Sequence, residues 1–162
     1  MNVGILSEKE GRRLQAPTSC APEDIVDCVD GYSTYVNGRG DTVTVSCEVA
    51  CEDACCVGTD ACLNFTGSVC KDSKSCSGTD SCKNANIAYV FNSCNGFRAC
   101  DEAGLEGYVG NVTNSCNDRR SCNGAGRNGG SIGVISSSCN NGYYACKVSL
   151  ISVIWLSLNE LD

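Results

Sequence analysis

Cysteines recur in pairs at regular intervals along this 162-residue chain, and this repeat constrains the fold more than any other feature. Residues 56–62 read Cys-Val-Gly-Thr-Asp-Ala-Cys, and residues 76–82 read Cys-Ser-Gly-Thr-Asp-Ser-Cys. Residues 94–100 and 116–122 keep the same cysteine spacing, and residues 139–146 keep it with one extra residue. Five copies of one cysteine-flanked loop indicate that a single structural unit recurs along most of the chain.

Aliphatic and small residues flank these loops at fixed offsets. Seven residues before each first cysteine stand Val49, Val69, Ile87, Val109 and Ile132. Three residues after each second cysteine stand Phe65, Ala85, Ala103, Ala125 and Ser149. The steps between the leading aliphatic residues are 20, 18, 22 and 23 residues, and a period of about 20–50 residues is typical of solenoids and of arrays of modules. The extra residues gather at one Gly-rich corner of the unit, which favours a solenoid.

We therefore predict an all-β, disulfide-rich parallel β-helix, a solenoid of about five coils with an N-terminal cap. The aliphatic positions are expected to stack inward. The expected organisation is a disordered N-terminal segment (1–18), a disulfide-tied cap (19–48), the five-coil solenoid (49–158) and a tail (159–162). The alternative is a string of separate cysteine-rich modules, which the lack of a Pro- or Ser-rich linker disfavours.

The spacing also bears on how the cysteines pair. Cysteine supplies 16 of the 162 residues, a share of about 10% that is typical of a disulfide scaffold. Six residues of extended strand span about 20 Å, whereas a disulfide requires Cα atoms within about 4.4–6.8 Å. The chain must either double back between paired cysteines or bond each cysteine to its equivalent in the next coil. Turn-forming glycines inside the loops favour bonds within each loop. The predicted pairs are Cys56 with Cys62, Cys76 with Cys82, Cys94 with Cys100, Cys116 with Cys122, and Cys139 with Cys146.

Six further cysteines have no partner that the repeat identifies. They are Cys20, Cys28, Cys47, Cys51, Cys55 and Cys70. We expect them to tie the cap to the first coils, because an uncovered coil end would expose a strand edge. Within the cap, residues 42–46 alternate Thr and Val as a strand does, and Asn37-Gly38 predicts a turn. The adjoining Arg39-Gly-Asp41 matches the integrin-recognition tripeptide, but a plain hairpin turn is the favoured interpretation.

Composition excludes several classes of function. Histidine is absent, which removes the commonest general base and the commonest zinc ligand. The net charge of −7 argues against a nucleic-acid partner. Asp60 and Asp80 stand at equivalent positions of adjacent units, where a carboxylate pair could bind calcium or act as acid and base. Arg98 and Arg120 follow at that position, so we expect a solvated face of mixed charge. We predict no catalytic residue, no cofactor and no metal site.

The Cys-x-Gly-x-x-(Ala/Ser)-Cys unit, followed by Ala or a similar residue and a Gly-rich corner, resembles a family of secreted repeat proteins of diatoms and related algae. Residues 55–62, 65–70 and 114–117 carry this likeness, which covers residues 55–147. The resemblance implies a place outside the cell or in its wall. The unit at 75–85 is also similar to the disulfide-braced coil of beetle antifreeze β-helices, from which this chain departs in repeat length and in lacking flat threonine ranks.

The even number of cysteines predicts an oxidising compartment and therefore export to the cell exterior or wall. Residues 1–10 lack the apolar stretch of a signal peptide, so export requires a signal that is not visible in this chain. The apolar run at 148–158 is too short to span a membrane.

We predict a non-catalytic, structural or adhesive extracellular scaffold; the alternatives are an ice-binding β-helix and a polysaccharide-binding module. Ice binding would need a continuous rank of small hydroxyl residues, and Thr59 and Thr79 are followed by Phe97 and Arg119. The expected partners are a polysaccharide or another wall protein. Aromatic and arginine residues between the paired cysteines form the candidate binding surface, namely Phe97, Arg98, Arg119, Arg120, Tyr143 and Tyr144. Asn64 and Asn111 begin Asn-x-Thr motifs and are candidate glycosylation sites.

Overall fold

The computed structural model describes residues 20–52, 54–71, 73–146 and 155–156. Its regular structure is mostly β. One sheet has six strands in the order β1-β4-β5-β6-β7-β8, and β2 and β3 form a separate pair. Helical structure in this part of the chain is limited to a 3-10 turn, η1 (Pro22–Asp24), and the four-residue α1 (Cys47–Ala50). No helix among the described residues is long and apolar enough to cross a membrane.

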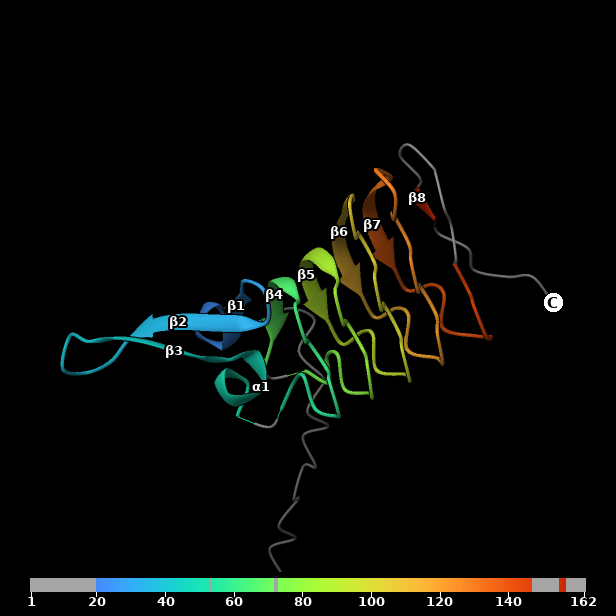
Figure 1. Cartoon of the computed structure of the whole chain (residues 1–162). Helices are drawn as coiled ribbons and strands as arrows, with labels where there is room; N and C mark the ends of the chain where they lie inside the picture. Colours follow the sequence, from blue (N-terminus) through green and yellow to red (C-terminus); the bar gives the residue numbers. More distant parts are fainter. Residues whose placement is uncertain (1–19, 53, 72, 147–154, 157–162) are drawn as a thin grey trace, which may run out of the picture.

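Parallel strands stacked one per turn form the body of the molecule (Figure 1). β4 (Thr66–Cys70), β5 (Asn86–Phe91), β6 (Tyr108–Thr113) and β7 (Ser131–Ser136) pair in parallel in that order, and β8 (Trp155–Leu156) follows β7. The chain therefore completes three turns between β4 and β7. The predicted all-β, disulfide-rich solenoid is confirmed, whereas the predicted count of five coils is not.

The strand register explains the core. Ile87 is paired with Val109, and Val109 with Ile132, so the leading aliphatic residues of successive coils stand above one another. A second inward column holds Val90, Val112 and Ile135. All of these side chains are buried, and because the two columns are three residues apart, the strands depart here from a strict alternation of faces.

A column of small residues lines the opposite part of the interior. Ala85, Ala103 and Ala125 are almost completely buried, and Phe65 occupies the equivalent place in the coil that leads into β4. The larger ring of Phe65 therefore fills the first position of the column, next to the N-terminal segment.

Val49 does not belong to the inward column. Its side chain is 63% exposed, and it lies in α1. The Ser46 hydroxyl accepts a hydrogen bond from the backbone N–H of Val49 at 3.3 Å, which is the geometry of a helix N-cap. This cap holds residues 47–50 in a helical turn instead of a strand, so the prediction of Val49 as the inward residue of a first coil is wrong.

The N-terminal segment covers the first edge of the parallel sheet. β1 (Ile25–Cys28) pairs antiparallel with β4, with Ile25 opposite Cys70. Disulfides join Cys20 to Cys70, Cys28 to Cys47, and Cys51 to Cys55. These bonds give partners to the six cysteines that the repeat left unassigned.

β2 (Tyr32–Val36) and β3 (Thr42–Ser46) form a hairpin that extends away from the stacked coils (Figure 1). At its tip the side-chain oxygen Oδ1 of Asn37 accepts hydrogen bonds from the backbone N–H groups of Arg39 (2.9 Å) and Asp41 (3.0 Å). This Asx turn places the Arg39-Gly-Asp41 tripeptide in an exposed loop. The predicted disordered segment 1–18, the tail 159–162 and most of the predicted last strand lie outside the described residues.

Candidate binding surface

Every cysteine-flanked loop of the repeat is closed by its own disulfide. The bonded pairs are Cys56–Cys62, Cys76–Cys82, Cys94–Cys100, Cys116–Cys122 and Cys139–Cys146. Their Cα atoms lie 5.5 to 5.7 Å apart, so the chain doubles back within each coil. No cysteine of the chain is free. Eight disulfides indicate an oxidising compartment, as is usual for secreted or extracellular proteins.

The loops turn through residues with left-handed backbone conformation. Both cysteines of each loop have positive φ, and so does one non-glycine residue between them: Asp60, Asp80, Arg98, Arg120 or Tyr144, with φ from 55° to 66°. A left-handed conformation costs about 1–2 kcal/mol for a non-glycine residue. Hydrogen bonds between coils offset this cost, as where the N–H of Cys76 donates to the Ser93 carbonyl at 3.0 Å and that of Cys94 to the Ser115 carbonyl at 3.1 Å.

Backbone hydrogen bonds also hold the exposed loop residues in register. The N–H of Arg98 donates to the Thr79 carbonyl at 3.0 Å, and the N–H of Arg120 donates to the Phe97 carbonyl at 2.8 Å. Equivalent loop positions therefore stack along the solenoid axis in two adjacent columns. One column contains Thr59, Thr79, Phe97 and Arg119, and the other contains Asp60, Asp80, Arg98 and Arg120.

The N-terminal half of these columns is a network of opposite charges. The Lys83 ammonium contacts the Asp60 carboxylate at 2.9 Å and the Asp80 carboxylate at 3.0 Å, and Arg98 Nε contacts Asp80 at 3.2 Å. The hydrogen bond from Lys83 lowers the pKa of Asp80, and the hydrogen bond to Asp60 raises the pKa of Lys83. The two aspartates share a cation, which is the mixed-charge face that the sequence predicted.

The C-terminal half gathers the six residues of the predicted binding surface, which we call the arginine–aromatic ridge (Phe97, Arg98, Arg119, Arg120, Tyr143 and Tyr144). The guanidinium carbon of Arg119 lies 5.1 Å from the ring centroid of Phe97 and 5.4 Å from that of Tyr143. The guanidinium carbon of Arg120 lies 5.3 Å from the Tyr143 centroid and 5.5 Å from that of Tyr144. These are cation–π distances, so cations and rings alternate along the ridge.

Two arginines of the ridge have no acidic partner in the described part of the chain. Arg98 is paired with Asp80, but no carboxylate among the described residues lies within 4.0 Å of Arg119 or Arg120. Asp118, the nearest acid in sequence, instead accepts backbone hydrogen bonds from Gly142 at 2.9 Å and from Arg119 at 2.6 Å. These bonds lower the pKa of Asp118 and fix its carboxylate to the backbone.

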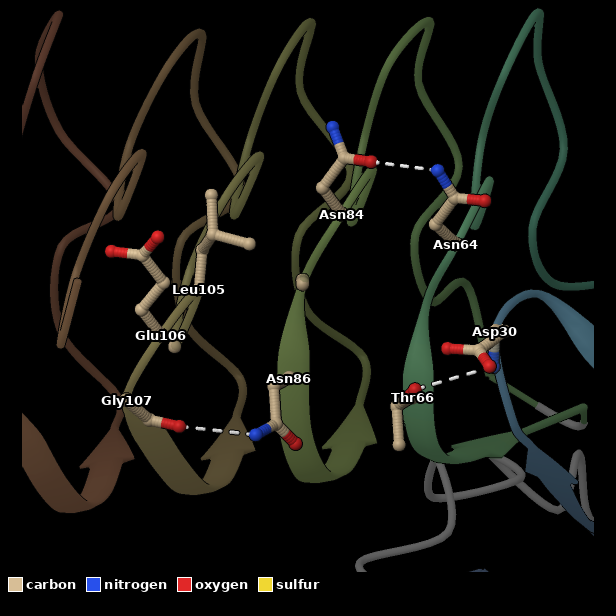
Figure 2. A pocket seen from close by; sticks show the side chains of 10 residues that line it. Asp30, Asn64, Thr66, Asn84, Asn86, Leu105, Glu106 and Gly107 are labelled. Atoms are coloured by element: carbon tan, nitrogen blue, oxygen red, sulfur yellow. Dashed lines mark hydrogen bonds between the residues drawn. The ribbon is translucent and has the colours of Figure 1, made fainter. Parts of the chain in front are cut away.

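A polar groove of about 380 Å³ crosses several coils on another part of the surface (Figure 2). Its amide side chains are already engaged within the protein: Asn64 Nδ2 donates to Asn84 Oδ1 at 2.9 Å, and Asn86 Nδ2 donates to the Gly107 carbonyl at 3.0 Å. Leu105 and Glu106 complete one side. Sequence reasoning missed this groove, although Asn64 and Asn84 each stand two residues after the second cysteine of a loop.

The two candidate glycosylation sites are both exposed. Asn111 lies in β6, next to the buried Val112 and pointing outward, as strand alternation predicts. Asn64 lies at the rim of the groove, where its amide is bonded to Asn84. The side chain of Asn111 is therefore the more accessible of the two to a glycosylating enzyme.

Two groups of cysteine sulfurs lie close enough together to suggest metal ligands. They are Cys51, Cys55 and Cys56, and Cys100, Cys116 and Cys122. Every one of these sulfurs is in a disulfide, whereas the thiolate is the metal-binding form. Their proximity thus results from the stacking of disulfides in successive coils.

Residues 54–162 match the model of a protein family described as a domain of unknown function, DUF7640. The chain belongs to this family. No curated protein and no solved structure is similar enough to count as a match. The DUF7640 region begins just after α1 and contains all five disulfide loops and the whole arginine–aromatic ridge. The β2–β3 hairpin and β1 precede it.

Proposed function

We propose that this chain is a non-catalytic extracellular scaffold, structural or adhesive, that acts at the cell wall or surface. The observation that carries the proposal is the place of the disulfides. Each intracoil disulfide closes one loop, and the residues of the arginine–aromatic ridge lie in the last three of these loops. Their side chains therefore project from backbone segments that a disulfide holds closed. A rigid surface loses little conformational entropy when it binds, which favours adhesion.

The residue types of the ridge support a role in binding a partner. Arginine and tyrosine are enriched at the energetically important positions of interfaces. Tyr143 is 52% exposed, and Phe97 and Tyr144 are each 37% exposed. Aromatic side chains in this environment bury a large area at low entropic cost when a partner covers them.

A structural role also accounts for the raised pKa of Asp101. Burial raises the pKa of Asp101 to about 6, with the charge of Glu102 as the next cause. A perturbed acid can mark a catalytic site, but Asp101 lines neither the groove nor the ridge. Its carboxylate accepts a hydrogen bond from Asn123 of the next coil at 3.3 Å, so we assign it to the contact between coils.

Retention on insoluble, protein-free cell-wall material tests the proposal. The wild-type chain should be retained, and the triple variant Phe97→Ser, Arg119→Ser, Tyr143→Ser should be lost in the wash. A matched control changes Tyr35, Arg39 and Tyr108 to Ser, which are exposed residues away from the ridge. Retention of the ridge variant at the wild-type level, or no retention of the wild type, would contradict the proposal.

The threonine column does not favour the ice-binding alternative. Thr59 and Thr79 are exposed on adjacent coils, but Phe97 and Arg119 continue the same column. A flat hydroxyl surface is thus two coils long. Thermal hysteresis of the wild-type chain tests this alternative directly, and a hysteresis that survives the ridge substitutions would favour ice binding.

A further inference from the structure

We propose that the Arg119–Arg120 pair of the arginine–aromatic ridge binds the carboxylate groups of an acidic polysaccharide, a polymer of uronic acid residues. This inference rests on the proposed function and names the chemical class of its partner. Three features of the ridge carry it: two cations that share one ring, no ion pair between either arginine and an acid of the described residues, and aromatic faces ordered along one axis.

One ring brings the two cations together. Both guanidinium carbons lie over Tyr143, at 5.4 Å for Arg119 and 5.3 Å for Arg120. Two like charges that share one ring repel each other, and an anion that contacts both offsets that repulsion. Arg120 is fixed in place, because its Nη1 donates to the hydroxyl groups of Tyr143 and Tyr144 at 2.6 Å each.

The guanidinium of Arg119 is available to a ligand. Among the described residues it makes neither an ion pair nor a side-chain hydrogen bond, and it rests only on the rings of Phe97 and Tyr143. A planar guanidinium presents five donors in a fork that matches a carboxylate. Because the rings of Phe97 and Tyr143 already hold this fork in position, binding would immobilise few further rotatable bonds of the Arg119 side chain.

The order of the groups favours a polymer over a single small anion. Phe97, Arg119 and Tyr143 come from successive coils, and stacked strands lie about 4.8 Å apart. Flat apolar faces therefore alternate with cations along a straight line. Sugar rings offer apolar C–H faces to aromatic rings, and a uronic acid adds a carboxylate to each ring, so a linear polyuronate matches both components.

The net charge of the whole chain limits the binding of a polyanion to the ridge. With a net charge of −7, the protein repels polyanions at long range, and this repulsion is screened beyond about 8–10 Å in physiological salt. Attraction at the ridge is local, because the described cations of the adjacent columns are paired: Arg98 and Lys83 both contact Asp80.

The experiment compares polygalacturonate with the same polymer after methyl esterification, which removes the charge and keeps the sugar backbone. The dissociation constant of the full-length, oxidised chain is measured for both by calorimetry. The test variant is Arg119→Gln/Arg120→Gln. The control is Arg39→Gln/Arg127→Gln, which removes the same net charge from exposed positions off the ridge. A third variant, Arg119→Lys/Arg120→Lys, keeps the charge and loses the fork.

We expect wild type and the control to bind polygalacturonate equally and the esterified polymer at least about tenfold more weakly, because a charge-assisted contact contributes roughly that factor. The Gln variant should lose about tenfold or more for the charged polymer only, with the Lys variant between the two. Near-ultraviolet circular dichroism identical to wild type shows that the variants are folded.

Several results would overturn the inference. Equal affinity for charged and esterified polymer would show binding to neutral sugar and leave the adhesive scaffold standing. Equal losses in the Gln variant and the control would show a diffuse charge effect. Inorganic phosphate that competes at the same concentration of charge would show a small-anion site. Absence of binding to polygalacturonate, together with retention on wall material, would reject this ligand class without rejecting the proposed function.

Discussion

Gly110 of β6 lies directly against the backbone carbonyl of Gly133 in β7, and a Cβ atom at Gly110 would overlap that carbonyl oxygen. Among the described residues, no atom lies within 4 Å of the place that a Cβ atom of Gly133 would occupy. The two glycines stand between the same paired positions of adjacent strands, Val109 with Ile132 and Asn111 with Val134. Contact between β6 and β7 therefore requires glycine at position 110.

Substitution of Gly110 by Ala should destabilise the solenoid by about 2–3 kcal/mol or more, because the new methyl group can be accommodated only by moving β7. Gly38→Ala is the matched control, because Gly38 lies in the exposed hairpin loop with no atom within 4 Å of the place that its Cβ would occupy. It should change stability by less than about 0.5 kcal/mol. Chemical unfolding of both variants measures the difference. Equal effects of the two substitutions would show that the strands are not packed as described.

The disulfides should differ in their contribution to stability according to the length of chain that they close. Cys94–Cys100 spans 6 residues and Cys20–Cys70 spans 50. The chain-entropy relation gives about 2 kcal/mol for the shorter loop and about 4 kcal/mol for the longer one. Double Ala variants of each pair, unfolded thermally without reductant, measure the two contributions. A larger loss from the short loop would show that the native contacts which this disulfide holds in place outweigh chain entropy.

Phe65 and Phe97 allow the same substitution to be compared inside and outside the core. Phe65 is fully buried at the end of the alanine column, and Phe97 is 37% exposed on the ridge. Phe65→Ala should cost about 3–5 kcal/mol through lost burial and a cavity, and Phe97→Ala about 1 kcal/mol or less. Denaturant midpoints test this order, which would be reversed if the ridge were part of the folding core.

Asp101 should make stability depend on pH. Its pKa is raised from 3.8 to about 6 by burial, so the folded state binds the proton more tightly than the unfolded state. The contribution of Asp101 therefore falls as pH rises from about 4 to about 6. The lowered pKa values of Asp80 and Asp118 act in the opposite sense, since their stabilisation is lost as pH falls below about 4.

The variant Asp101→Asn should remove this decline and gain about 1 kcal/mol at pH 7, less than the full shift implies because solvent screens the carboxylate. Unfolding free energies at pH 4 to 7 provide the measurement. Glu106→Gln removes the same charge from an exposed position and should keep the decline. A decline that persists in Asp101→Asn would assign the pH dependence to another acid.

Much of the solenoid could be predicted because its determinants repeat. The aliphatic residues at Ile87, Val109 and Ile132 recur at a fixed distance from a cysteine, and only a coil of constant geometry stacks such residues inward. The disulfide loops followed from the same spacing, since two cysteines six residues apart can bond only if the chain turns between them. Val49 has the right offset, yet it lies outside the core, because the Ser46 cap and the disulfide of Cys47 belong to the N-terminal segment and have no counterpart in the repeat.

The amino-acid sequence by itself determined the mostly β architecture, the inward columns, the intracoil disulfides and the six exposed residues of the ridge, because each depends on residues close together in the chain. Only the tertiary structure decided which cysteines tie the N-terminal segment, where the groove lies, and that Arg119 and Arg120 share the ring of Tyr143. Apart from the short Cys51–Cys55 bond, those contacts join residues about twenty or more positions apart. Their geometry depends on the register between coils, which interstrand hydrogen bonds and left-handed loop residues establish and no local pattern encodes.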